Sequence, residues 1–424
     1  MDPQPFAGIR VVEFGQFVAV PYAGQLLADG GADVLKIEAL IGDSSRHVAP
    51  LVPGETRIFV ARNRGKRSLP LALKHADAPE VIDALLAWAD VALFNFRPGL
   101  AQSLGLDADT LRSRFPKLVT ATVTPFGHHG PDAELAGMDI VVQARSGLMA
   151  AQGRIVDGRP AAGEPVPADY MCAMTLSFGI ASALFRRERT GIGGAVDVSL
   201  MHAAMALANN QMVYAHDHDG ERRDATLARL AEQRDAGTPY AEQLAQVQSS
   251  SARPIAKVYY RTFECSNKAI AVACGSVKLR IAFAQAIGLK DARVRAMDGA
   301  DADEYYEGVR IEAETIMRSR TAEQWLTQLR AAGIPVSDVK MIQEMFDDEQ
   351  ALSNGMLYVQ DHPMVGPVTL VGTPVKLDDD GFAPSKPTAP LGSQTRAILH
   401  AIGFVDSRIE QLLASEATRE QLDE

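Results

Sequence analysis

Residues 8–38 read GIRVVEFGQFVAVPYAGQLLADGGADVLKIE, and this stretch decides the fold. It begins and ends with short runs rich in valine and isoleucine, 9–14 and 33–37, which are typical of buried strands. The segment between them, residues 22–28, has the character of a helix. A strand, a helix and a second strand in this order predict a βαβ unit with parallel strands.

The same alternation continues through the first third of the chain. Residues 78–89 carry apolar side chains at helical spacing, and the runs 91–94 and 118–123 again have the character of strands. This pattern predicts an α/β fold with a parallel sheet covered by helices on both faces. The turn after the first strand carries a single glycine, Gly15, in place of GxGxxG, which disfavours a nicotinamide cofactor.

The later chain predicts a second, smaller domain. Apolar helices are expected at 171–188 and 201–214, and the polar, charged stretch 216–255 is interpreted as a connector. Within 256–334 the β-rich runs come first and helical stretches follow, which predicts an α+β domain. The individual elements expected are strands at 258–260 and 270–272 and helices at 277–287, 304–317, 321–332 and 394–402.

Composition and charge exclude several classes of protein. The 424 residues are 47% hydrophobic and 22% charged, near the globular average, so a disordered or fibrous chain is excluded. A formal net charge of −11 disfavours nucleic-acid and anionic-membrane partners. Cys172, Cys265 and Cys274 are not spaced as metal ligands and are predicted to be reduced, buried thiols of a cytoplasmic protein. The apolar stretch 171–185 is shorter than the roughly 20 residues that cross a bilayer.

Asp169 is the first candidate for chemistry. It lies in PVPADY, residues 165–170, immediately before the apolar helix expected at 171–188. One interpretation is structural, because aspartate is a favoured helix N-cap after an extended proline segment. The other is functional, because the helix dipole and free backbone amides hold a carboxylate ionised there and could receive the oxyanion formed when it attacks an acyl group. Both roles are compatible with the sequence.

Two further segments are candidate ligand contacts. Residues 62–68, RNRGKRS, form a basic cluster with Arg46 and Lys74, which suits a phosphorylated ligand or, alternatively, a solvated loop. Residues 95–99, NFRPG, follow a strand at the sheet edge where open α/β sheets bind ligands, although the segment also has the character of a simple turn. The run HDHD at 216–219 has no accompanying ligand set, so no metal site is predicted.

Taken in order, these pieces resemble the family III CoA transferases, the CaiB/BaiF group that includes formyl-CoA and carnitine-CoA transferases and 2-methylacyl-CoA racemases. The resemblance covers essentially the whole chain. It is carried by residues 8–38, NRGKRSLPLALK at 63–74, NFRPG at 95–99, DY at 169–170, TGIGGAVDVSL at 190–200, AAGIPVSDVKMIQEMFDDEQ at 331–350 and APLGSQTRAILHAIGF at 389–404.

The resemblance implies a large Rossmann-like, CoA-binding domain made from residues 1–215 and 335–424, with 256–334 as the small domain. It implies an interlocked homodimer in the cytoplasm whose substrates are an acyl-CoA thioester and a carboxylic acid. CoA transfer through an aspartyl anhydride and an aspartyl-CoA thioester uses no permanently bound cofactor and no metal.

Carried over by position, Asp169 is the nucleophile. The positions that match CoA-binding or substrate-binding residues of the family are Gln16, Val18, Ala19, Arg46, Leu71, Lys74, Asn95, Phe96, Arg97, Met138 and Asp139. Met138 is informative because racemase members carry a histidine there, and methionine cannot move protons. The chain is therefore predicted to be a transferase; a racemase and a non-catalytic CoA-binding homologue are the alternatives.

Overall fold

The computed structural model describes residues 4–249, 254–296, 301–378, 381–383 and 386–421. The chain forms two compact units, of which the larger consists of Met1–Glu221 with Glu349–Glu424 and the smaller of Arg222–Asp348. The larger unit therefore draws on both ends of the chain. The domain boundaries expected from the sequence, at residues 215, 255 and 334, remain predictions.

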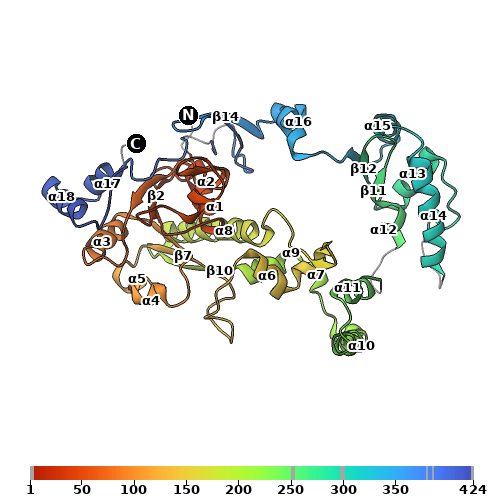
Figure 1. Cartoon of the computed structure of the whole chain (residues 1–424), viewed down its shortest axis with the longest axis horizontal. Coiled ribbons are helices and arrows are strands. Elements are labelled where there is room, and N and C mark those ends of the chain that lie inside the picture. Colours follow the sequence, from red (N-terminus) through yellow and green to blue (C-terminus); the bar gives the residue numbers. More distant parts are fainter. Residues whose placement is uncertain (1–3, 250–253, 297–300, 379–380, 384–385, 422–424) are drawn as a thin grey trace. The chain divides into compact units, whose positions relative to one another are not determined.

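A six-stranded parallel sheet forms the centre of the larger unit (Figure 1). Its strands, in spatial order, are β10 (Gly194–Ser199), β7 (Val119–Thr124), β6 (Val91–Phe94), β1 (Arg10–Glu13), β2 (Asp33–Glu38) and β5 (Arg67–Pro70). The chain runs outward from β1 to β5 and then returns to place β6 beside β1. Open parallel sheets bind ligands at the carboxyl ends of the strands at such a reversal. The predicted α/β class is confirmed.

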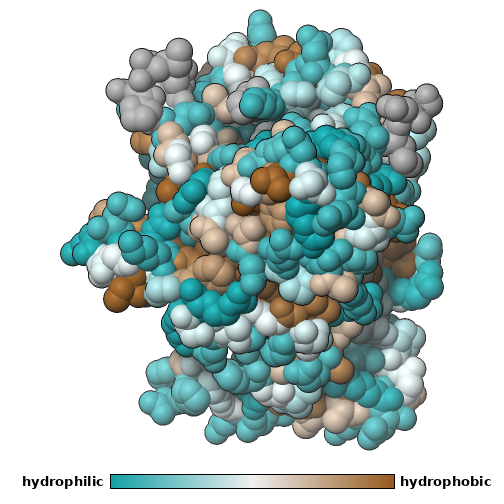
Figure 2. All heavy atoms as spheres, turned by 90° about the vertical axis from the view of Figure 1, so that its left-hand side faces the viewer, coloured by the Kyte–Doolittle hydropathy of each residue, from teal (hydrophilic) through white to brown (hydrophobic). Residues whose placement is uncertain are grey.

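Alternate residues of the strands face two helical layers. Val11 faces the layer of α1 (Ala19–Asp29), α8 (Pro167–Thr190) and α9 (Leu200–Leu207). Its neighbour Val12 faces the layer of α3 (Ala78–Trp88), α5 (Ala108–Arg114), α17 (Thr395–Ala401) and α18 (Asp406–Ala414). Both valines are fully buried. The face shown in Figure 2 is mostly hydrophilic, with hydrophobic side chains scattered in small groups.

Shorter elements surround the sheet. They are η1 (Ser44–His47), β3 (Pro50–Val52), β4 (Glu55–Thr56), α2 (Arg57–Asn63), α4 (Leu100–Ser103), α6 (Asp139–Ser146), α7 (Leu148–Gln152), β8 (Ile155–Val156), β9 (Arg159–Pro160), η2 (Asn209–Gln211), α16 (Glu349–Ser353), β14 (Leu357–His362) and β15 (Gly366–Val371). Helix α10 (His216–Asp235) spans the change from the larger to the smaller unit.

The smaller unit has the α+β character expected from the sequence. Strands β11 (Tyr260–Glu264), β12 (Ala269–Ala273) and β13 (Val336–Asp338) form an antiparallel sheet in that order. Its helices are α11 (Tyr240–Ser249), α12 (Pro254–Val258), α13 (Val277–Ile287), α14 (Ala302–Met317), α15 (Ala322–Ala331) and the 3-10 helix η3 (Ile342–Asp347). The buried Trp325 indole donates to the Met317 carbonyl at 2.8 Å, so the core keeps its polar atom paired.

Several elements differ from the predictions. Helix α8 begins at Pro167 instead of residue 171, because proline is well tolerated in the first helical turn. Helix α9 ends at Leu207 instead of residue 214, where two asparagines follow in a 3-10 turn. Val258 ends a helix, α12, where a strand was expected.

Helix α8 is 24 residues long and, by length and composition alone, apolar enough to cross a membrane. In this structure it packs on α1 and α9, and its residues Cys172, Leu176 and Ile180 lie in the core of the larger unit. Cys172 is free and buried, as are Cys265 and Cys274, which confirms the prediction of unpaired, buried thiols.

Candidate active site

The loop after β1 is held firmly at the switch point of the sheet. The backbone amide of Gln16 donates to Asn95 Oδ1 at 3.0 Å, and Asn95 Nδ2 donates to the backbone carbonyl of Gln16 at 2.9 Å. Lys36 Nζ donates to the Gly15 carbonyl at 2.7 Å. A Cβ atom on Gly15 would lie 2.1 Å from Val20 Cγ1, so the turn requires glycine. Asn95, a predicted CoA contact, thus uses its side-chain amide to fix this loop.

A pocket of about 340 Å³ opens beside this loop at the carboxyl edge of the sheet. Four of the predicted CoA contacts line it: Gln16, Leu71, Lys74 and Phe96. The Phe96 ring lies against Phe14, another lining residue, with 5.8 Å between ring centroids. Lys74 is exposed. An apolar wall with an exposed ammonium group is suited to a ligand that carries both apolar groups and phosphates.

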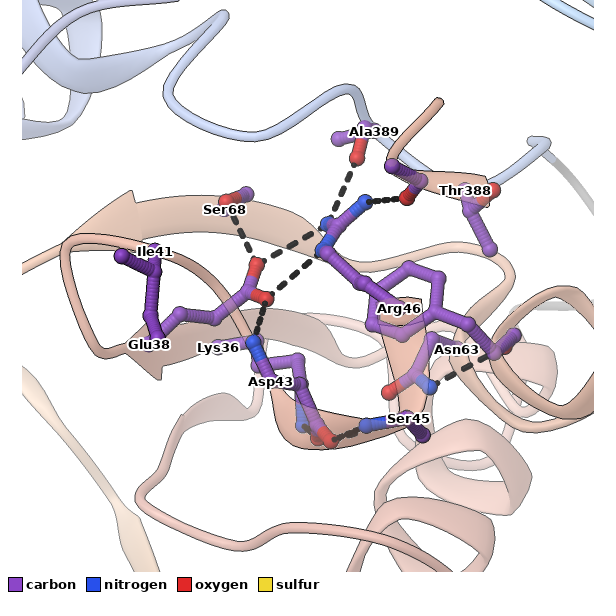
Figure 3. A network of polar contacts seen from close by, with 12 residues as sticks. Lys36, Glu38, Ile41, Asp43, Ser45, Arg46, Asn63, Ser68, Thr388 and Ala389 are labelled. Carbon is purple, nitrogen blue, oxygen red and sulfur yellow. Dashed lines mark hydrogen bonds and ion pairs between the residues drawn. The ribbon is translucent and has the colours of Figure 1, made fainter. Parts of the chain in front are cut away.

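Arg46 occupies the centre of a buried polar network (Figure 3). Its Nε and Nη2 donate to Glu38 at 2.8 and 3.0 Å, and its Nη1 donates to Glu55 at 2.7 Å. The two remaining N–H groups donate to the carbonyls of Gly54 and Ala389 at 3.2 and 3.0 Å. A guanidinium has five N–H donors, and all five are used inside the protein. No guanidinium N–H group is therefore left for the predicted contact of Arg46 with CoA.

The basic cluster at 62–68 is likewise largely internal. Arg64 Nη2 lies 2.6 Å from Asp29 Oδ2, and Lys66 Nζ lies 2.8 Å from Glu13 Oε2, with all four side chains buried. Burial lowers the pKa of Lys66 to about 8, although the charge of Glu13 acts in the opposite direction. Arg64 and Lys66 therefore form internal ion pairs. They neither belong to a solvated loop nor form a phosphate site.

Asp169 lies in the first turn of α8, as its third residue. The N-cap position is taken by Val166, whose φ of 41° is left-handed and whose side chain cannot cap. Pro167 follows and has no N–H group. The prediction that Asp169 is the N-cap is therefore wrong. Its carboxylate is half-buried and makes no capping hydrogen bond to the helix.

Asp139 supplies the missing cap from α6. Its Oδ1 accepts hydrogen bonds from the backbone amides of Ala168 at 2.9 Å and Asp169 at 3.1 Å. The amides expected to be free for an oxyanion are thus occupied. Asp139 Oδ2 accepts from Gln143 Nε2, one turn further along α6, and the Gln143 side chain also exchanges two hydrogen bonds with the backbone of Gly163. Sequence reasoning missed Gln143, although its i, i+4 spacing from Asp139 was a usable signal.

The ionisation of Asp169 is shifted by its surroundings. Burial and the nearby Asp139 charge raise its pKa to about 7, while Arg62 lowers it. These surroundings oppose the ionisation that the helix start was expected to favour. Arg62 Nε also donates to the Tyr170 hydroxyl at 3.3 Å, and the Tyr170 ring meets Tyr22 of α1 at 5.0 Å between centroids.

The other predicted site residues differ in how far they are exposed to solvent. Val18 and Ala19 are buried at the start of α1, whereas Arg97 is exposed after β6. Met138 is 58% exposed and occupies the N-cap of α6. Within the described ranges, no group of three or more histidine, cysteine, aspartate or glutamate side chains is arranged to hold a metal ion.

Comparisons with known proteins place the chain in a family. Residues 6–395 match the model of CoA-transferase family III. The chain is 30% identical to cinnamoyl-CoA:phenyllactate CoA-transferase of Clostridium sporogenes over 420 residues, 96% of this chain and 95% of the relative. It is 26% identical to succinyl-CoA:glutarate CoA-transferase of Mus musculus over 97% of this chain and 90% of the relative. A CAIB/BAIF family protein from Brucella suis has a similar structure, with a TM-score of 0.72, 26% identity, and coverage of 95% and 100%.

Proposed function

The chain belongs to CoA-transferase family III and is a CoA-transferring enzyme, and we propose that it moves CoA from an acyl-CoA thioester to a carboxylic acid with Asp169 as the nucleophile. The related enzymes are named for phenyllactate, oxalate and glutarate, all of them carboxylic acids. We therefore assign a carboxylic acid as acceptor, and no permanently bound cofactor takes part in the proposed steps.

The proposed reaction has four acyl-transfer steps. The Asp169 carboxylate attacks the thioester carbonyl, the C–S bond breaks, and a mixed anhydride and CoA thiolate form. The thiolate then attacks the Asp169 side-chain carbonyl and releases the donor acid as a carboxylate. The acceptor carboxylate attacks the resulting aspartyl-CoA thioester and expels the thiolate. Attack of the thiolate on the acceptor's acyl carbon gives the new acyl-CoA and restores Asp169, so no oxidant, reductant or net proton is consumed.

The observation that carries this proposal is the half-buried Asp169 carboxylate in the first turn of α8, where burial and the charge of Asp139 raise its pKa to about 7. A carboxylate of raised pKa is a stronger nucleophile once ionised than an ordinary aspartate. Helix α1 begins close to the pocket and also contacts the neighbour of Asp169. Gln16 lines the pocket, and α1, which starts three residues later, carries Tyr22 against Tyr170 beside Asp169.

We place CoA in the pocket at the carboxyl edge of the sheet. Gln16, Leu71 and Phe96 would contact its apolar and amide portions, and Lys74 would pair with a phosphate. The exposed Arg97 supplies a second cation near the same edge. Asn95, Val18 and Ala19 support the loop and helix start that border this pocket, whereas Asp139 acts on Asp169 itself.

We further propose that the enzyme is a cytoplasmic homodimer, interlocked as the resemblance implies. Met174, Phe178 and Phe185 lie on one side of α8 and are 39%, 75% and 66% exposed, an apolar stripe that a second copy would cover. Analytical ultracentrifugation should show a dimer that Phe178→Asp weakens and that the control Val405→Asp, at a position that is 64% exposed, leaves intact. A monomeric wild type would contradict this.

Intact-protein mass spectrometry tests the nucleophile. We expect wild type incubated with acetyl-CoA, succinyl-CoA or cinnamoyl-CoA to gain a CoA-sized adduct that hydroxylamine removes. Asp169→Ala should gain none, while the exposed control Asp157→Asn should behave as wild type. An adduct that persists in Asp169→Ala, or turnover with no adduct on wild type, would refute the proposal.

A further inference from the structure

We propose that Asp139 is a positioning residue, which caps α8 from a separate helix and thereby holds Asp169 in place for attack on the thioester. The functional part of this inference rests on the proposed function of Asp169. The structural part stands on hydrogen bonds that do not depend on that function. Asp139 is 5% exposed and its oxygens are taken up by protein donors, so it is not placed as a direct substrate contact.

The start of α8 depends on this outside acceptor. A helix leaves its first amides without partners, and they are normally served by a polar N-cap side chain. Here the N-cap is Val166, and the first helical residue is Pro167. The Tyr170 backbone amide donates to the Val166 carbonyl at 3.2 Å. The amides that remain are those of Ala168 and Asp169, and Asp139 Oδ1 accepts from both.

Gln143 makes the contact a two-point clamp. It is fully buried, lies one turn after Asp139 on α6, and donates to the Asp139 carboxylate. It also donates to the Gly163 carbonyl at 3.2 Å and accepts from the Gly163 amide at 2.9 Å. Helix α6 therefore holds the backbone through hydrogen bonds at Gly163 and again at Asp169. These two positions lie on either side of the segment that lacks an N-cap side chain. This fixes the backbone that carries the nucleophile.

The clamp also brings a second carboxylate beside Asp169. The charged groups that act on Asp169 are Asp139 from α6 and Arg62 from α2, with opposite effects on its ionisation. The thiol of Cys172 lies about one turn further along α8, and burial and the Asp169 charge raise its pKa, so it stays neutral. Asp139→Asn removes the charge but keeps an oxygen that accepts hydrogen bonds, whereas Asp139→Ala removes both. The two variants separate positioning from charge.

The matched control is Asp107, the N-cap of α5, whose Oδ1 accepts from the Thr110 amide at 3.0 Å. Asp107→Asn and Asp107→Ala make the same chemical changes at a helix start outside the candidate site. Hydrogen exchange with mass spectrometry on the peptide at the start of α8 is the first readout, and it needs no activity. Asp139→Ala should speed exchange of the Ala168 and Asp169 amides, Asp139→Asn should do so less, and both Asp107 variants should leave this peptide unchanged.

The second readout is the rate of the CoA adduct at saturating acyl-CoA across pH. Asp139→Asn should shift the acidic limb to lower pH by about one unit, and Asp139→Ala should slow the adduct by about 100-fold through misplacement of the nucleophile. Unchanged exchange in Asp139→Ala would overturn the cap. An unchanged pH limb and rate in variants that still form the adduct would overturn the positioning role. Absence of the adduct in wild type would overturn the nucleophile instead, while exchange still decides the cap.

Discussion

Replacing Arg46 with alanine distinguishes the structural role that the network gives this residue from the CoA contact that the sequence suggested. The change removes five hydrogen-bond donors and leaves the carboxylates of Glu38 and Glu55 buried without their shared cation. It also removes the guanidinium that lies 3.6 Å from the centroid of the Phe59 ring. Breaking a buried ion pair by deleting one partner costs about 3–5 kcal/mol, so we expect a loss of this size in the free energy of unfolding.

The loss should depend on pH in a defined direction. Burial alone would raise the pKa of Glu38, but the charge and hydrogen bonds of Arg46, helped by Lys36 and Ser68, hold the pKa below its ordinary value. In wild type the Arg46–Glu38 ion pair therefore stabilises the fold at pH values above the ordinary glutamate pKa. This stabilisation is lost as the pH falls through the lowered pKa of Glu38. In the variant, the charge of Lys36 and the hydrogen bond from Ser68 still oppose burial but the contribution of Arg46 is gone, so Glu38 takes up a proton at higher pH than in wild type. The difference between the two proteins should shrink as the pH falls toward about 5.

Urea unfolding near neutral pH and at about pH 5 measures both effects. The exposed Arg97→Ala is the matched control, and its unfolding free energy should change by no more than about 0.5 kcal/mol. If Arg46→Ala keeps wild-type stability and instead raises the KM for acyl-CoA, the buried network has been misread and the guanidinium serves the substrate.

Other consequences can be checked separately. Lys74→Ala should raise the KM for acyl-CoA by about 10-fold with unfolding free energy unchanged, because its ammonium is exposed at the pocket; an unaltered KM would remove it from the CoA site. Gly15→Ala should cost about 1–3 kcal/mol in urea unfolding because its Cβ would overlap Val20, and wild-type stability would contradict the tight turn. The adduct rate of wild type should rise as the pH passes about 7, where Asp169 loses its proton, and a midpoint near an ordinary aspartate pKa would contradict its raised pKa.

Local sequence patterns predicted the larger architecture. Strands β1, β2, β6 and β7 were predictable because they are short apolar runs that alternate with helix-like segments at 22–28 and 78–89. Strand β5 escaped prediction, since it begins within the charged run 62–68. That run has the character of solvated surface, and only partners from distant segments make it internal.

The candidate site was predicted less completely, because its key contacts join residues far apart in the chain. Asp169 was identified from PVPADY, but its cap, Asp139, lies 30 residues earlier on another helix. Arg46 was assigned to CoA from its position in the family pattern, while Ala389, one of its acceptors, lies 343 residues away. The spacing of residues along a chain does not show which group accepts a hydrogen bond from a backbone amide. Nor does it show that all the N–H donors of a guanidinium are already used.

The most direct test of the central claim is to locate the covalent adduct. Wild-type protein is mixed with acyl-CoA, quenched, treated with hydroxylamine and digested, and the peptide that contains Asp169 is sequenced by mass spectrometry. We predict a hydroxamate on Asp169 and an unmodified Asp139 in the same sample. A hydroxamate on another residue, or CoA transfer without any hydroxamate, would contradict the assignment of Asp169 as the nucleophile.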